Sequence, residues 1–262
     1  MSEPSAPGGR QVRRPAPTAG ERPEVVLGAE GALRLLRCGR LDVTGRLVDA
    51  SNATLYGSLT LDGVQAACVY KPVAGERPLW DFPDGTLAAR EVAAHAVSEA
   101  TGWGLVPPTV LRDGPFGPGM CQLWIDIDER VDLVALVRGN DPQLRRMSVF
   151  DAVVNNADRK GGHLLPTRDG HVYGVDHGVC FAVEDKLRTI LWQWRGRPLP
   201  DDIVEVLARL DTDLTGDLGA RLRRLLDPDE VAATRTRLAR LRATCRHPGP
   251  SEDWPSVPWP PF

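Results

Sequence analysis

The chain changes character near residue 129, and this division limits its fold more than any other feature. Before that point, short apolar runs separated by polar turns predict β-strands, whereas apolar residues further on recur mostly at helical spacing. The 262 residues are enough for a sizeable buried core. We therefore predict an α+β protein of two lobes, β-rich over residues 25–128 and helical over residues 129–246.

The β-rich half contains a hairpin signal. From Leu41 to Lys71 the pattern is that of strands, and the turn Asp62-Gly63 separates two of them. The Ala-rich stretch over residues 86–101 predicts a helix that ends at Gly102, since glycine readily adopts the left-handed conformation that follows many helices. Two further strands are predicted around residues 107–111 and 121–127.

The helical half begins with a clear start signal. Asp141 precedes Pro142, and an aspartate cap followed by a first-turn proline is typical of a helix start. An apolar stripe follows on one helical face: Leu144, Met147, Phe150 and Val154. Three more helices are predicted, around residues 200–210, 213–226 and 228–244, and the last opens with a capping box from Asp227 to Glu230.

The two ends of the chain have biased compositions. Residues 1–24 are rich in Pro, Gly, Ala and Arg and hold almost no large apolar side chains, which predicts a disordered tail. Residues 247–262 are rich in Pro and Trp, which predicts an extended segment that docks on the body or is offered to a partner.

Charge and cysteine usage narrow the class of protein. A net charge of −3, without a dense Lys/Arg block in the body of the chain, gives no sign of a nucleic-acid partner. Five scattered cysteines without a CxxC pair are typical of reduced thiols, so we expect a cytoplasmic protein and neither a disulfide framework nor a zinc site. No apolar run approaches the ~20 residues of a membrane span, so we expect no stable membrane insertion.

Residues 151–181 carry the most chemistry. Asp158 lies in the loop NNADRKGGHLL, and Asp176 lies in the turn GVDHG after a short polar hairpin. His163, a candidate metal ligand, follows Asp158 by five residues. This is the layout of a phosphoryl-transfer site, where one aspartate orients the acceptor hydroxyl and a second holds the metal on the phosphates. Taken singly, each aspartate is also compatible with an ordinary turn.

Two charged residues upstream complete the pattern. Lys71 ends a predicted strand in VYKP, where its ammonium group can pair with phosphate oxygens, and Glu91 lies early on the next helix, where it can anchor that lysine. An edge-strand lysine and a first-turn acid are the plainer interpretations of each alone. The small polar turn that includes Ser51 and Asn52 can cap phosphates through its N–H groups, although an ordinary hairpin turn fits equally.

The chain resembles the phosphatidylinositol 3-/4-kinase superfamily in four motifs: VYKP, the helix beginning REVAAHAVSEATGWGLVPPT, the loop NNADRKGGHLL and the GVDHG turn. The type II lipid kinases and the HipA-like bacterial kinases are the nearer relatives. The whole chain is similar to an actinobacterial family with distant similarity to these kinases. The resemblance covers about residues 40–245 and implies an atypical, two-lobed protein-kinase-like fold with a β-rich N-lobe and a helical C-lobe.

The resemblance also implies roles for the residues of these motifs. Lys71 would be the phosphate lysine, Glu91 its partner and Asp158 the catalytic aspartate. Asp176 would bind the metal. The segment that includes Leu123 and Trp124 would lie where backbone groups meet adenine.

One position departs from the pattern of these kinases. They usually have Asn five residues after the catalytic aspartate as a second metal ligand, and this chain has His163 there. An imidazole can bind a metal, but Mg²⁺ prefers oxygen. His163 is therefore compatible with a Mn²⁺ ligand, with a phosphate contact or with weakened catalysis.

The resemblance implies an ATP- and divalent-metal-dependent phosphotransferase, with ATP and Mg²⁺ or Mn²⁺ as cofactors. Its acceptor would be a hydroxyl group of an unknown protein or small molecule. The alternative is a pseudokinase, a nucleotide-binding or scaffolding module, which His163 and the lack of a Gly-rich loop favour. Transfer of AMP, with the nucleotide inverted, is a third interpretation that the sequence leaves open.

Overall fold

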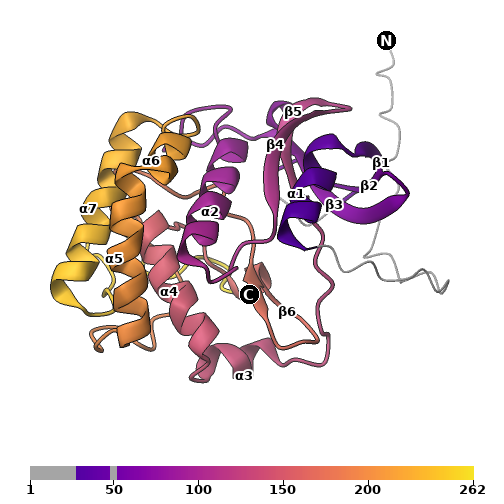
Figure 1. Cartoon of the computed structure of the whole chain (residues 1–262). Helices are drawn as coiled ribbons and strands as arrows, with labels where there is room; N and C mark the ends of the chain where they lie inside the picture. The colour runs from indigo at the N-terminus through magenta and orange to yellow at the C-terminus, as the bar shows by residue number, and fades with distance from the viewer. Residues whose placement is uncertain (1–27, 48–51) are drawn as a thin grey trace, which may run out of the picture.

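A computed structural model describes residues 28–47 and 52–262 of the chain. Two predictions, a disordered tail over residues 1–24 and a phosphate contact at Ser51, lie outside the described residues. Within the described ranges the β-rich part precedes the helical part, as the sequence predicts (Figure 1).

A five-stranded antiparallel sheet forms the first lobe, in the order β1-β2-β3-β5-β4. Its strands are β1 (Arg40–Arg46), β2 (Leu55–Leu61), β3 (Val64–Pro72), β4 (Thr109–Gly114) and β5 (Gly117–Leu123). The turn between β2 and β3 is the predicted one: Asp62 and Gly63 both have positive φ, 50° and 79°, and Leu61 pairs with Val64. This conformation suits a two-residue hairpin because its twist matches that of the strands.

Two strand boundaries differ from the prediction. The strand predicted around residues 107–111 begins at Thr109, since Pro107 and Pro108 have no N–H group to donate to a neighbouring strand. The strand predicted around residues 121–127 ends at Leu123. There the chain leaves the sheet toward the second lobe, after Trp124 donates its N–H to the carbonyl oxygen of Ala67 at 3.0 Å.

The helices are α1 (Ala29–Cys38), α2 (Leu87–Thr101), α3 (Leu133–Arg138), α4 (Pro142–Val154), α5 (Asp201–Thr215), α6 (Asp217–Leu222) and α7 (Pro228–Thr244). Gly102 ends α2 with φ 72°, and Asp141 caps α4 by accepting from the N–H groups of Gln143 and Leu144. The predicted capping box of Asp227 and Glu230 opens α7. The helix predicted over residues 213–226 is shorter, because Gly216 interrupts the chain between α5 and α6.

Helix α2 lies between the sheet and the other helices (Figure 1). Its residues Ala93 and Val97 belong to the large core that α4, α5, α6 and α7 build, whereas Ala88 and Val92 pack on Met120 of the sheet. Helix α1 covers the sheet through a separate core that includes Leu35 and Leu36. A helix that contacts both lobes can carry a side chain from one lobe to the other.

A two-stranded hairpin, β6 (Leu164–Pro166) and β7 (Val172–Gly174), follows α4. The loop before β6 contains Asp158, and the loop after β7 contains Asp176, so this hairpin sets the spacing of the two aspartates. Among the residues that the structure describes, no helix is both long and apolar enough to cross a membrane.

Candidate active site

Lys71 and Glu91 form the centre of the site. Lys71 is the penultimate residue of β3, and its Nζ lies 2.6 Å from Oε1 of Glu91 on α2. Glu76 holds the start of α2, because its carboxylate accepts from the N–H groups of Leu87 and Ala88 at 3.1 and 2.8 Å. Glu91 is 1% exposed, so the lysine satisfies a carboxylate that would otherwise be buried at high cost.

Asp176 joins this pair from the other lobe. Its Oδ1 lies 2.9 Å from Nζ of Lys71, and its φ of 63° is left-handed, which aspartate tolerates better than most residues. The lysine holds the pKa of Asp176 well below its ordinary value. Burial alone lowers the pKa of Lys71, but Asp176 and Glu91 outweigh it, and the net pKa lies above the ordinary value. Lys71 and Asp176 are therefore both charged at neutral pH.

Glu91 also fixes the backbone next to Asp176. Its Oε2 accepts from the N–H of His177 at 2.9 Å, so one buried carboxylate contacts both the sheet lysine and the loop after β7. Removing Glu91 would leave both Lys71 and this loop with one partner fewer.

Asp158 lies in the loop that follows α4. Asn155 ends the helix with φ 53°, and Oδ1 of Asn156 accepts from the N–H of Asp158 at 3.0 Å. The Asp158 side chain is 30% exposed and its Oδ2 lies 3.1 Å from Nζ of Lys160. A carboxylate in this position is fixed at its backbone and open to a ligand.

The sequence pattern did not predict the buried polar group beneath this loop. Arg159 binds the carboxylate of Asp151 through Nε and Nη2, and its Nη2 lies 2.6 Å from Nε2 of His177. All three side chains are fully buried. Burial first, then Arg159, lowers the pKa of His177 well below its ordinary value, so the ring is neutral. Arg159 thus links the Asp158 loop to the residue after Asp176.

His163 lies next to Asp176, and the two residues come from the loops before β6 and after β7. Its Nε2 lies 3.5 Å from Oδ2 of Asp176, and its buried Nδ1 has no partner. Burial lowers the pKa of His163, which favours the neutral ring that metals bind. No group of three or more His, Cys, Asp or Glu side chains in the described part of the chain is arranged to hold a metal. Asp176 and His163 would supply one oxygen and one nitrogen ligand to a divalent metal, which would need its other ligands from outside this pair.

The structure brings four of the predicted residues together around one small cavity. Asn52, Lys71, Glu91 and Asp176 line one small cavity with Ala53, Pro72, Glu76, Leu87, Ala88 and Gly178. The side chain of Asn52 already makes one hydrogen bond, because its Oδ1 accepts from the N–H of Arg77 at 2.9 Å. Leu123 and Trp124 do not line this cavity, and their N–H groups donate to Pro108 and Ala67, both at 3.0 Å. Their predicted role at adenine stays a prediction.

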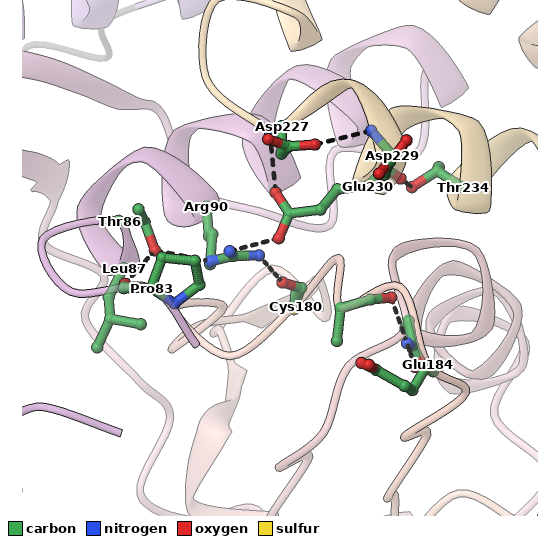
Figure 2. A network of polar contacts seen from close by, with 12 residues as sticks. Pro83, Thr86, Leu87, Arg90, Cys180, Glu184, Asp227, Asp229, Glu230 and Thr234 are labelled. Atoms are coloured by element: carbon green, nitrogen blue, oxygen red, sulfur yellow. Dashed lines mark hydrogen bonds and ion pairs between the residues drawn. The ribbon is translucent and has the colours of Figure 1, made fainter. Parts of the chain in front are cut away.

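Arg90 ties α2 to the helical lobe (Figure 2). Its guanidinium group donates to the carbonyl oxygen of Cys180 at 2.8 Å and to Oε1 of Glu230 at 2.5 Å. The side chain is 1% exposed. Since Arg90 precedes Glu91, this ion pair fixes the turn of α2 that presents Glu91 to Lys71.

Two of the missed residues had a weak signal in the sequence. Asp151 follows Met147 by four positions on the apolar stripe of α4, and a carboxylate on a buried face needs a cationic partner. Arg90 lies next to Glu91 on an Ala-rich helix that has no polar face. The partners Arg159 and Glu230 have no such signal, because Arg and Glu are ordinarily exposed.

The five-stranded sheet, the helical second lobe and the site between them define a protein-kinase-like fold, as predicted. The crystal structure of the Golgi casein kinase with Mn/ADP bound is similar, with a TM-score of 0.56 and 13% sequence identity over 83% of this chain and 75% of that chain. At this identity the similarity shows the fold alone. No protein-family model matches the chain.

The chain belongs to the same family as Protein Rv2133c of Mycobacterium tuberculosis, with which it is 46% identical over 263 residues, 87% of this chain and 94% of that protein. Phosphatidylinositol 4-kinase gamma 4 of Arabidopsis thaliana is 27% identical over 163 residues. That match spans 51% of this chain and 29% of the plant protein.

Proposed function

We propose that this protein is an ATP- and divalent-metal-dependent phosphotransferase that acts on a hydroxyl acceptor. The observation that carries the proposal is the contact of one lysine, Lys71, with carboxylates of both lobes, Glu91 and Asp176. Asp158 lies on the loop that precedes the β6–β7 hairpin, and Asp176 lies on the loop that follows this hairpin. The similarity to a phosphatidylinositol 4-kinase and to the fold of a kinase crystallised with Mn/ADP supports this assignment.

Lys71 would bind phosphate oxygens of ATP, and Glu91 would hold the ammonium group in place. Asp176 and His163 are the residues that would hold a divalent metal. When bound, the metal would neutralise the negative charge of the phosphates. Asn52, which lines the same cavity from the loop before β2, would contact the phosphates.

Asp158 would orient the acceptor hydroxyl and receive its proton. As the hydroxyl oxygen bonds to the γ-phosphorus, the bond from that phosphorus to the bridging oxygen breaks and ADP leaves. Lys160, whose Nζ lies 3.1 Å from Oδ2 of Asp158, would stabilise the transferred phosphoryl group. The acceptor is a hydroxyl compound of protein or small-molecule type, and the lipid name belongs to the plant relative alone.

The test compares Asp158→Asn with Asp169→Asn, which makes the same chemical change in the turn between β6 and β7. Both variants and the parent are incubated with γ-labelled ATP and Mn²⁺ or Mg²⁺. We expect Asp158→Asn to lower label release or transfer by about 10²–10⁴-fold, the usual worth of a positioned acid–base group, and to leave nucleotide binding intact. Equal turnover in Asp158→Asn and the parent would contradict the role of Asp158.

A pseudokinase is the second candidate, and His163 is the observation that favours it. An imidazole stands where the related kinases usually have an oxygen ligand, which Mg²⁺ prefers. Nucleotide binding by the parent without turnover, with either metal, would support this alternative.

A further inference from the structure

Residues 251–262, here called the tail segment, reach the loop that carries Asp158. The carbonyl oxygen of Pro261 accepts from the N–H of Gly161 at 2.8 Å, three residues after Asp158. The ring of Phe262 packs on the same glycine. In Figure 1 the C-terminal mark accordingly lies beside β6, which follows this loop.

The tail segment also holds the loop by an indirect route. The carbonyl oxygen of Ser256 accepts from the N–H of Thr189 at 3.1 Å and from Nε1 of Trp192 at 2.8 Å. Residues 188–190 in turn hold the backbone of Arg159 by two hydrogen bonds. The N–H of Arg159 donates to the carbonyl oxygen of residue 188 at 3.0 Å, and its carbonyl oxygen accepts from the N–H of residue 190 at 3.3 Å. The tail segment therefore contacts the loop directly at Gly161 and is linked to Arg159 through residues 188–190.

The other end of the tail segment is anchored on aromatic rings. Trp254 stacks on Trp80 with ring centroids 6.0 Å apart and an interplanar angle of 17°. The buried Nζ of Lys186 lies 4.9 Å from the Trp254 ring and 5.3 Å from the Trp80 ring, distances at which a cation is attracted to an aromatic face. The tail segment is thus held on both sides of the contacts that its Ser256 makes with Thr189 and Trp192.

The contact with the ring of Phe262 leaves no room for a side chain at position 161. A Cβ atom at position 161 would lie 3.0 Å from Cγ of Phe262 and closer still to Cδ1 and Cε1, so any side chain there must displace the ring. A Cβ atom at the neighbouring Gly162 would meet nothing within 4 Å. Neither glycine has a left-handed backbone, so alanine strains neither position.

We propose that the tail segment is a positioning element of the active site, which braces the loop of Asp158 in the geometry that phosphoryl transfer needs. The proposal rests on the proposed function for its catalytic part. The Asp158 side chain pairs with Lys160 of the same loop, its N–H donates to Oδ1 of Asn156, and the tail segment contacts the loop three residues later at Gly161. Small displacements of a catalytic group slow catalysis strongly, so a brace acts on turnover more than on nucleotide binding.

The test uses full-length Gly161→Ala and the matched control Gly162→Ala. Hydrogen exchange of the backbone amides of residues 158–163 reports the brace directly, and turnover of ATP with Mn²⁺ reports its catalytic effect. We expect Gly161→Ala to speed exchange about tenfold or more and to lower kcat by about 10- to 100-fold, with the nucleotide Kd within a factor of about two. Gly162→Ala should match the parent in all three.

Repeating Gly161→Ala in a Phe262→Ala variant tests whether its effect comes from displacing the ring. Phe262→Ala removes the ring and keeps the Pro261 carbonyl. There Gly161→Ala should have no further effect on exchange or kcat, since the ring atoms nearest to the added methyl group are gone. An undiminished effect would mean that the added methyl group acts within the loop itself and would overturn the proposal.

Other outcomes distinguish a failure of the tail-segment proposal from a failure of the proposed phosphotransferase function. The proposal that the tail segment braces the loop would be overturned if Gly161→Ala behaved like Gly162→Ala or raised kcat. A raised kcat would mean that the tail segment covers the site and inhibits turnover. If the parent turns over no ATP, the proposed function fails, and amide exchange alone then decides whether the brace exists.

Discussion

Nζ of Lys71 lies 2.9 Å from Oδ1 of Asp176, although the two residues are 105 positions apart in the sequence. The same ammonium group lies 2.6 Å from Glu91, so one positive charge is shared by two carboxylates. The remaining oxygen of Asp176 faces the neutral ring of His163 at 3.5 Å. The centre therefore carries excess negative charge, which favours a divalent cation there.

Replacing Lys71 with Met should weaken the binding of ATP with Mn²⁺ by about 10- to 100-fold, because a hydrogen bond to a charged group contributes about 1.5–3 kcal/mol. Isothermal titration calorimetry measures the change. Lys71→Arg keeps the charge but not the compact ammonium group, so it should recover only part of the affinity. An unchanged Kd in Lys71→Met would remove Lys71 from the nucleotide site.

Replacing His163 with Asn should shift the metal preference toward Mg²⁺, because the amide oxygen is a harder ligand than the imidazole nitrogen. The ratio of ATP affinities with Mg²⁺ and Mn²⁺ measures this preference. His171→Asn makes the same change in the turn between β6 and β7 and should leave the ratio unchanged. A constant ratio in both variants would show that His163 does not contact the metal.

Breaking the Arg90–Glu230 pair should lower the free energy of unfolding by about 3–5 kcal/mol, the usual cost of an uncompensated buried charge. Urea denaturation of Arg90→Met, Glu230→Gln and the double variant measures it. The double variant should cost less than the sum of the single variants, because it removes both charges together. Strictly additive losses would argue that the two side chains do not interact.

The order of elements and the candidate residues were predictable from local signals. The Asp62-Gly63 turn, the glycine after α2 and the Asp141 and Asp227 caps each depend on a few adjacent residues, and all are confirmed. Lys71, Glu91 and Asp176 were predicted from their order along the chain, and the structure brings them into contact.

The buried support of the site was not predictable in the same way. Arg159 is paired with Asp151 only because the chain after α4 turns back beneath its own helix, and no local pattern reports such a return. The contact of Phe262 with Gly161 joins residues about a hundred positions apart through a Pro-rich segment without periodicity. Tertiary packing alone determines these partners.

The fold should lose stability in mild acid, and His247 should account for part of the loss. Burial, and then Arg145 and Arg197, lower its pKa to about 4, and Arg145 Nε donates to its Nε2 at 3.0 Å. In the unfolded chain a histidine binds a proton near pH 6.5. Between these values the unfolded state binds more protons, so the free energy of unfolding falls as the pH falls.

His247→Gln should therefore lose about 2 kcal/mol less stability than the parent between about pH 7 and pH 4.5. Urea denaturation at both pH values measures the difference. Equal losses in the two proteins would mean that the ring of His247 is already protonated in the fold.

The most direct test of the metal–nucleotide site is a thermal-shift titration of the parent and of Asp176→Asn with ATP and Mn²⁺. Asparagine suits this position because it tolerates the left-handed backbone of Asp176, and Asp169→Asn is the matched control. Ligand at 100 times its Kd should add about 2.7 kcal/mol, which raises the Tm of the parent and the control by about 5 to 10 °C. We predict that Asp176→Asn shows no metal-dependent shift. An equal shift in Asp176→Asn, or none in the parent with either Mn²⁺ or Mg²⁺, would contradict a metal–nucleotide site at Asp176.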